Sequence, residues 1–180
     1  PSVRALNPFT DYSNPFSIRR GNAFLNPEFI DSYELSFSKY TKSGISINPS
    51  LYYKHTKDVI TRVPRQNPDL ENGLIVMQEN IGTTDTYGAE FIFSGKLLPI
   101  WRLTASSNFY WNTTTSTITD VDLNNQAVGG RFSLINNFTI KKNTDLQIMS
   151  WYNMPRYFAL GYIKYMASID LALKHKIWGG

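Results

Sequence analysis

Residues 101–111 read WRLTASSNFYW, and this stretch decides the fold class. Apolar or small side chains occupy most alternate positions from Trp101 to Trp111, and polar residues such as Arg102 and Asn108 lie between them. This alternation predicts a β-strand with one apolar and one polar face. Ten residues at about 3.3 Å each, tilted by about 45°, rise roughly 23 Å, close to the apolar band, about 25 Å tall, of a membrane β-barrel. The two tryptophans would then mark the two membrane interfaces, in two aromatic rows: Tyr40 and Trp178 would join Trp101, and Tyr53, Tyr87 and Tyr152 would join Trp111.

The same alternation recurs on both sides of this stretch and predicts an all-β fold, an antiparallel meander of about seven strands. The strands are expected at residues 32–40, 44–54, 86–96, 101–111, 131–141, 145–152 and 163–174. These ranges span 8 to 12 residues, against a usual strand length of about 5 to 6. Pro49 lacks a ladder donor and predicts a bulge or a local break in the second strand. Gly129-Gly130 predicts a further bulge or the end of a loop.

The connections between these strands alternate in length. Tight turns are expected at residues 41–43, 97–100 and 142–143, and long polar excursions at residues 55–80, 112–126 and 153–160. Short turns at one end of the strands and long loops at the other are typical of an outer-membrane β-barrel. A soluble sandwich has short strands and no such asymmetry.

The composition agrees with this interpretation and excludes several other classes. Of the 180 residues, 42% are hydrophobic, 14% aromatic and only 18% charged, which is too aromatic and too uncharged for a disordered chain. No apolar run reaches the roughly 18 residues of a transmembrane helix. The chain has no cysteine, which rules out a disulfide scaffold and a Cys-based zinc site. The net charge of +4 comes from scattered residues, so nucleic-acid binding is not expected.

Three motifs follow one another along the chain. Residues 5–35 read ALNPFTDYSNPFSIRRGNAFLNPEFIDSYEL, residues 50–60 read SLYYKHTKDVI, and residues 80–91 read NIGTTDTYGAEF. In this order they resemble a segment of the TonB-dependent outer-membrane receptors of Gram-negative bacteria, within the outer membrane β-barrel group. Ala23 stands where that family usually has proline.

The resemblance implies a barrel of about 22 strands whose lumen is filled by a separate N-terminal plug. Residues 1–180 would then be a single segment of the barrel domain, with an extracellular loop at 1–29 and about seven strands at 30–178, and without the plug. The implied function is uptake of a nutrient or metal chelate at the cell outer membrane. The implied partners are the lipid bilayer, the plug and TonB.

No residue pattern points to catalysis, a cofactor or a metal. His55 and His175 have no carboxylate or second ligand at a suitable spacing. Asp120, Asp122 and Asn124 begin like a calcium-binding EF-hand loop, but the loop lacks the required glycine. The chain is therefore not expected to be an enzyme.

Aromatic and guanidinium groups in the predicted extracellular segments are the candidate ligand contacts, since they stack on sugars and bind oxyanions in pairs. These residues are Tyr12, Arg19, Arg20, Arg62, Arg65, Arg156 and Tyr157. The ligand would be a small molecule, a glycan or a metal chelate. An open alternative is a soluble secreted β-sandwich that binds carbohydrate through exposed Tyr and Trp, with shorter strands and stable folding in plain buffer.

The lipid-facing assignment of residues 101–111 predicts a large effect of a single charge. An arginine in place of Leu103 or Phe109 should destabilise the folded chain by up to the roughly 2–4 kcal/mol that such a charge costs at the bilayer midplane, because both side chains would lie within the apolar band. Denaturant unfolding in lipid vesicles measures this change. Asn108→Arg, on the opposite face, should have a much smaller effect. Equal stability of Phe109→Arg and the unaltered chain would show that this face does not meet lipid.

Overall fold

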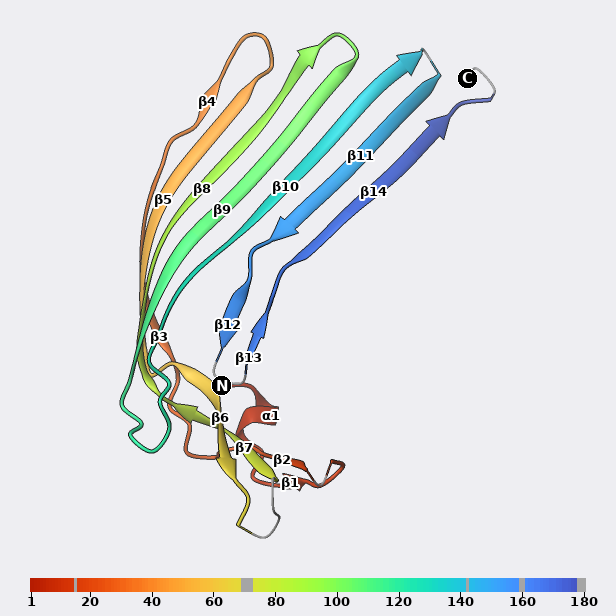
Figure 1. Cartoon of the computed structure of the whole chain (residues 1–180). Coiled ribbons are helices and arrows are strands. Elements are labelled where there is room, and N and C mark those ends of the chain that lie inside the picture. The colour runs from red at the N-terminus through yellow and green to blue at the C-terminus, as the bar shows by residue number, and fades with distance from the viewer. Residues whose placement is uncertain (15, 69–72, 142, 159–160, 178–180) are drawn as a thin grey trace.

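The computed structural model describes the chain except for residues 15, 69–72, 142, 159–160 and 178–180. Most of the described residues lie in strands, and the helix among them is α1 (Val3–Leu6), of four residues. Most of them form one long curved antiparallel sheet, and two smaller sheets lie at one end of it (Figure 1).

The described part of the large sheet follows a path of seven strands, with one further short strand at an edge. In spatial order they are β14 (Met166–His175), β11 (Thr144–Asn153), β10 (Asn125–Lys141), β9 (Trp101–Ser116), β8 (Gly82–Leu98), β5 (Ser46–Lys57) and β3 (Phe29–Ser36), with β4 (Lys39–Tyr40) paired to β5. All pairs are antiparallel. The predicted all-β fold with about seven antiparallel strands is thus confirmed. The strands β8, β9 and β10 are longer than predicted, with 17, 16 and 17 residues.

The smaller sheets are built from segments predicted as loops. One sheet has the order β1 (Thr10–Asp11), β2 (Ser17–Arg20), β7 (Leu74–Asn80) and β6 (Ile60–Gln66), and we call it the small sheet. The other is a hairpin of β12 (Arg156–Phe158) and β13 (Gly161–Ile163). Both lie at the end of the large sheet opposite its tight turns (Figure 1). The polar excursion predicted at 55–80 therefore contains a hairpin, and the loop predicted at 1–29 contains α1, β1 and β2.

The strand register places the predicted aromatic residues in rows. Tyr33, Tyr53, Tyr87 and Trp111 lie side by side on four neighbouring strands, with ring centroids 6.3, 4.9 and 6.1 Å apart. Toward the tight-turn end, Trp101 stacks on Phe138 at 5.8 Å and donates its indole N–H to Asn136 Oδ1 at 3.1 Å. The prediction that Trp178 joins this second row lies outside the described residues. An apolar band bounded by two aromatic rows is typical of strands that span a membrane, with the aromatic rows at its two interfaces.

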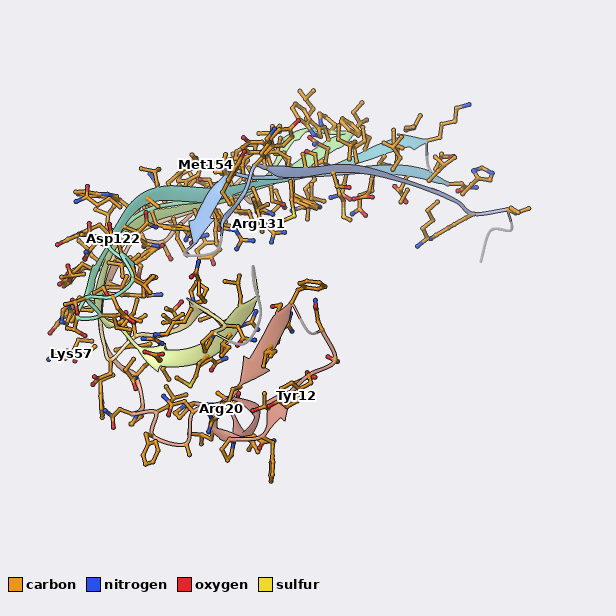
Figure 2. The ribbon with its side chains drawn as sticks, turned by 60° about the horizontal axis from the view of Figure 1, so that its bottom comes forward. Tyr12, Arg20, Lys57, Asp122, Arg131 and Met154 are labelled. Carbon is orange, nitrogen blue, oxygen red and sulfur yellow. The ribbon has the colours of Figure 1, made fainter. Side chains whose placement is uncertain are left out.

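The side chains between these rows are apolar and uncovered. Leu35, Ile169 and Leu171 are 75%, 74% and 70% exposed. Among the described residues no second sheet packs on this face, so the structure differs from the soluble sandwich left open by the sequence. The polar Arg131 lies on the concave side of the large sheet, where the small sheet also lies (Figure 2). The apolar face is therefore the convex, outer one.

Two glycines on the polar face leave room for tyrosine rings from the neighbouring strand. Gly88 is opposite Tyr52, and Gly129 is opposite Tyr110. A Cβ at either glycine would overlap the tyrosine ring. The bulge or loop end predicted at Gly129-Gly130 is therefore wrong, because β10 runs through both glycines without a shift in register. These glycines make room for a ring instead of bending the strand.

Pro49 disturbs the neighbouring strand and leaves its own intact. β5 pairs with β8 without a shift through Pro49, which lies opposite Phe91. The carbonyl of Pro49 accepts the N–H of Phe37 at 2.9 Å, so the side of Pro49 that lacks a donor faces the edge of the sheet. The edge strand is interrupted there, between β3 and β4. Proline is tolerated because it removes a bond only at this edge.

The packing of Tyr52 on Gly88 predicts that Gly88→Ala destabilises the sheet by about 1–3 kcal/mol, because the added methyl group overpacks the site. Denaturant unfolding of the chain in detergent micelles measures the change. In a Tyr52→Ala background the same substitution should have little effect, because the overlapping ring is gone. Equal losses in both backgrounds would place the cause elsewhere than in this contact.

Candidate functional site

Three parts of the chain meet at the end of the large sheet opposite the tight turns. They are the β6–β7 hairpin, the connection between β9 and β10, and the N-terminal segment. Val63 of β6 is fully buried there against Ile81 and Leu123, the latter from the connection between β9 and β10. The Thr117 N–H bonds the Ile81 carbonyl at 2.7 Å, which fixes that connection beside β7. This small apolar core joins the β6–β7 hairpin to the β9–β10 connection.

Arg65 of β6 adds ion pairs to this junction. It bonds both carboxylate oxygens of Glu79 on β7, and its Nε donates to Asp120 Oδ2 of the β9–β10 connection at 2.9 Å. The hydrogen bond from Arg65 lowers the pKa of Asp120. The bonds to Glu79 and Asp120 raise the pKa of Arg65. A predicted ligand contact is thus held by two carboxylates of the chain itself.

Asparagine, aspartate and glutamate side chains order the N-terminal segment. Asn7, Asp11, Asn14 and Asn22 each accept the backbone N–H two residues further on, at 2.9 to 3.1 Å. These Asx turns are a local alternative to regular secondary structure. They explain why the first sequence motif is rich in Asn and Asp.

Two further motif residues attach this segment to the β6–β7 hairpin. The Asn80 side chain bonds both the N–H and the carbonyl of Asn26, at 2.9 and 3.1 Å, and the carbonyl of Asp58 at 2.7 Å. Glu28 Oε1 accepts the Ile60 N–H at 2.7 Å. Sequence reasoning missed these roles, because the partners lie 22 to 54 residues apart.

The two faces of the small sheet carry different groups. Arg65 and Glu79 lie on the face that meets the apolar core, whereas Arg62 and its register partner Gln78 lie on the other. Arg19 of β2 is opposite Val76 and so shares the face of Arg62. The alternation of side chains along a strand thus separates Arg62 from Arg65, three residues away.

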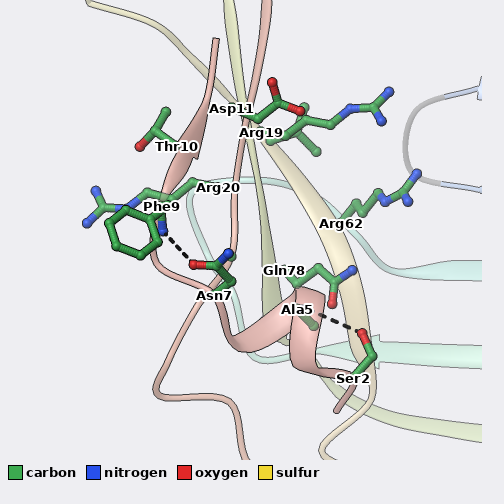
Figure 3. Close-up of a pocket in the computed structure, with 12 residues that line it drawn as sticks. Ser2, Ala5, Asn7, Phe9, Thr10, Asp11, Arg19, Arg20, Arg62 and Gln78 are labelled. Carbon is green, nitrogen blue, oxygen red and sulfur yellow. Dashed lines mark hydrogen bonds between the residues drawn. The ribbon is translucent and has the colours of Figure 1, made fainter. Parts of the chain in front are cut away.

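A cavity of about 440 Å³ opens between this second face and the N-terminal segment (Figure 3). Its lining includes Phe9, Asp11, Arg19, Arg20, Arg62 and Gln78. Figure 3 shows Arg19 and Arg62 extending to the same side, whereas Arg20 extends to the other. In the described part of the chain, no ion pair joins any of these three arginines to a carboxylate.

The other predicted contacts lie apart from this cavity lining. Tyr12 is 69% exposed near β1, and Arg156 lies exposed on β12 in the separate hairpin. Tyr157 follows Arg156 in β12, but its side chain lies outside the described residues. The structure therefore brings together Arg19, Arg20 and Arg62 from the predicted set.

One histidine has a carboxylate partner that spacing did not reveal. His55 Nδ1 lies 2.8 Å from Asp85 Oδ1, and the Tyr53 hydroxyl donates to the same oxygen at 2.7 Å. The pairing of β5 with β8 brings these groups together across 30 residues. Within the described ranges, no group of three His, Cys, Asp or Glu side chains could hold a metal ion. None of the described helices is long and apolar enough to cross a membrane.

The curved antiparallel sheet, with its apolar convex face between aromatic rows, defines a protein of the outer-membrane β-barrel class. The chain belongs to the outer membrane protein beta-barrel family, which it matches over residues 1–180. Its place is therefore the cell outer membrane, as predicted. No curated protein matches the chain.

The junction of Arg65 with Glu79 and Asp120 predicts that Arg65→Gln loosens the β9–β10 connection. Hydrogen exchange of the Thr117 amide should become about tenfold faster or more, because hydrogen bonds to charged groups contribute about 1.5–3 kcal/mol. Arg62→Gln is the matched control, since it changes the same strand on the opposite face and should leave this amide unaffected. Unchanged exchange in Arg65→Gln would show that the apolar core alone holds the connection.

Proposed function

We propose that the chain is a barrel-wall segment of a TonB-dependent outer-membrane receptor that takes up a nutrient or metal chelate. The observation that carries the proposal is that three regions with different properties follow one another along the length of the strands. One end has tight turns, the middle has an apolar outer face, and the other end folds into a unit with a cationic cavity. A receptor needs these parts: a lipid-facing wall and a binding surface above it.

The edges of the large sheet support the barrel part of the proposal. In the described chain, β14 and the β3–β4 edge each have a strand neighbour on one side only. In lipid, unpaired backbone groups cost several kcal/mol each, so strands that cross a bilayer close into a barrel. The proposal therefore includes further strands on both edges, up to the roughly 22 of the receptor family.

The polar face supports a hydrated interior that contacts a plug. Glu90, Asn108 and Arg131 lie opposite one another on β8, β9 and β10. Asn108 donates to Glu90 and accepts the Tyr52 hydroxyl at 3.3 Å, while Arg131 lies over the Trp151 ring at 5.6 Å. Such a mixture of charges and amides suits water and the surface of a folded plug.

In this proposal the segment has no catalytic role. The plug and TonB are its protein partners in the complete receptor, and the lipid bilayer surrounds the apolar face. The end with the small sheet faces the cell exterior, where the ligand arrives. This orientation follows from the rule that the longer connections of outer-membrane barrels lie outside the cell.

Site-specific photo-crosslinking in outer membranes tests the proposal. A photoreactive residue at Asn108, on the polar face, should yield an adduct with a plug polypeptide, identified by mass spectrometry. The same residue at Phe109, its neighbour on the apolar face, should yield adducts with lipid. These two positions are adjacent in β9 and differ only in the face they occupy. A lipid adduct or no peptide adduct at Asn108 would refute a plugged interior.

A further inference from the structure

We infer that the cavity beside the small sheet binds a small soluble anion with at least two oxyanion groups, through Arg19 and Arg62. Phosphate esters and polycarboxylates belong to this class. The inference rests on the proposed function, because it names the kind of ligand that the receptor would meet at its outer end. It goes further in assigning a particular cavity and two particular side chains.

The charge balance of the cavity carries the first step. Its described lining includes the guanidinium groups of Arg19 and Arg62, which extend to the same side, and the single carboxylate of Asp11. Arg20 also borders the cavity, but its guanidinium extends to the other side. Asp11 Oδ1 accepts the Ser13 N–H at 3.0 Å. The cavity thus keeps an excess of positive charge, which an anionic ligand would neutralise.

The contrast with Arg65 carries the second step. Arg65 lies three residues from Arg62 on the same strand, yet it is held by Glu79 and Asp120. No carboxylate in the described chain plays that part for Arg62 or Arg19. A guanidinium presents a planar fork of donors that matches an oxyanion with two parallel hydrogen bonds. Arg62 and Arg19 can therefore still bind an external oxyanion, whereas Arg65 already binds two carboxylates of the chain.

The geometry of the small sheet carries the third step. Arg19 on β2 and Arg62 on β6 flank the central strand β7, where their register partners are two residues apart. Their backbones therefore lie two strand spacings across and two residues along, roughly 12 Å apart. Both side chains extend to the same side (Figure 3). Between them Val76 is 8% exposed, and Ala5 of α1 is 4% exposed. Arg19 and Arg62 are themselves exposed, so this apolar floor gives a ligand a surface to pack on while the two guanidiniums stay open to solvent.

The location of the cavity favours a soluble anion over a lipid phosphate. The small sheet lies on the concave side of the large sheet (Figure 2), whereas the apolar face that meets the bilayer is convex. A lipid anchored in the outer leaflet would have to cross the wall to bring its headgroup to the cavity. A free solute entering from outside has no such obstacle. The volume of about 440 Å³ lies within the usual range for small-molecule sites.

Titration calorimetry of the folded chain in micelles of a neutral sugar detergent tests the inference, with inorganic pyrophosphate as the probe. Binding should be measurable for the unaltered chain and at least tenfold weaker for Arg19→Gln/Arg62→Gln. Arg19→Lys/Arg62→Lys keeps both charges and should bind with intermediate affinity, because lysine lacks the paired donors. Arg156→Gln, the matched control on the separate hairpin, should bind as the unaltered chain does. Circular dichroism verifies that each variant is folded.

The outcomes separate this inference from the proposed function. Equal binding by the double glutamine variant, or an equal loss in Arg156→Gln, would overturn the inference and leave the barrel wall untouched. No binding by the folded, unaltered chain would do the same. Competition by phosphatidylglycerol added to the micelles would show that a lipid phosphate reaches the cavity, which overturns the soluble ligand. A chain that folds fully in buffer without detergent would instead count against the proposed function.

Discussion

The structure depends on the need to pair every backbone N–H and C=O group wherever the chain is surrounded by lipid. Long strands in continuous register meet this need, and β8, β9 and β10 run for 16 or 17 residues to do so. The same requirement explains where irregularities are tolerated. Pro49 lacks a donor only toward the edge strand, and the register shift between β8 and β9 lies beside their tight turn. The middle of the sheet stays regular.

A second consequence concerns where the molecule keeps its buried core. The large sheet buries little against itself, because its apolar convex face meets lipid and, among the described residues, no second sheet packs on it. The fully buried side chain of the described residues, Val63, belongs to the junction at the end with the small sheet. There apolar contacts and the Arg65 ion pairs join the β6–β7 hairpin to the β9–β10 connection, and hydrogen bonds of Asn80 and Glu28 attach the N-terminal segment. The large sheet is thus stabilised by the lipid around it, and the end with the small sheet by the packing of its own side chains.

The sequence was informative where one physical rule acts along the chain. Alternation predicted the strands, their faces and the aromatic rows, because each depends on neighbours two residues apart. It did not predict the β6–β7 hairpin, whose Pro64 and polar residues resemble a loop. Nor did it predict the partners of Arg65, since Asp120 lies 55 residues away in another excursion. Three of the seven candidate contacts do line one cavity, because Arg19, Arg20 and Arg62 belong to paired segments of the small sheet.

The alternation of side chains between the two faces of a strand also determines what individual residues can bind. In β9 it separates Asn108, on the polar concave face, from Phe109, on the apolar convex face. In β6 it separates Arg65, which the fold neutralises, from Arg62, which it leaves facing a cavity. A shift of one residue in the pairing of β6 with β7 would exchange these two faces and bring Arg65 to the cavity. The tie between Asn80, Asn26 and Asp58 opposes such a shift, because it fixes the base of the hairpin. Motif residues that touch no ligand would in this way determine which arginine is available to one.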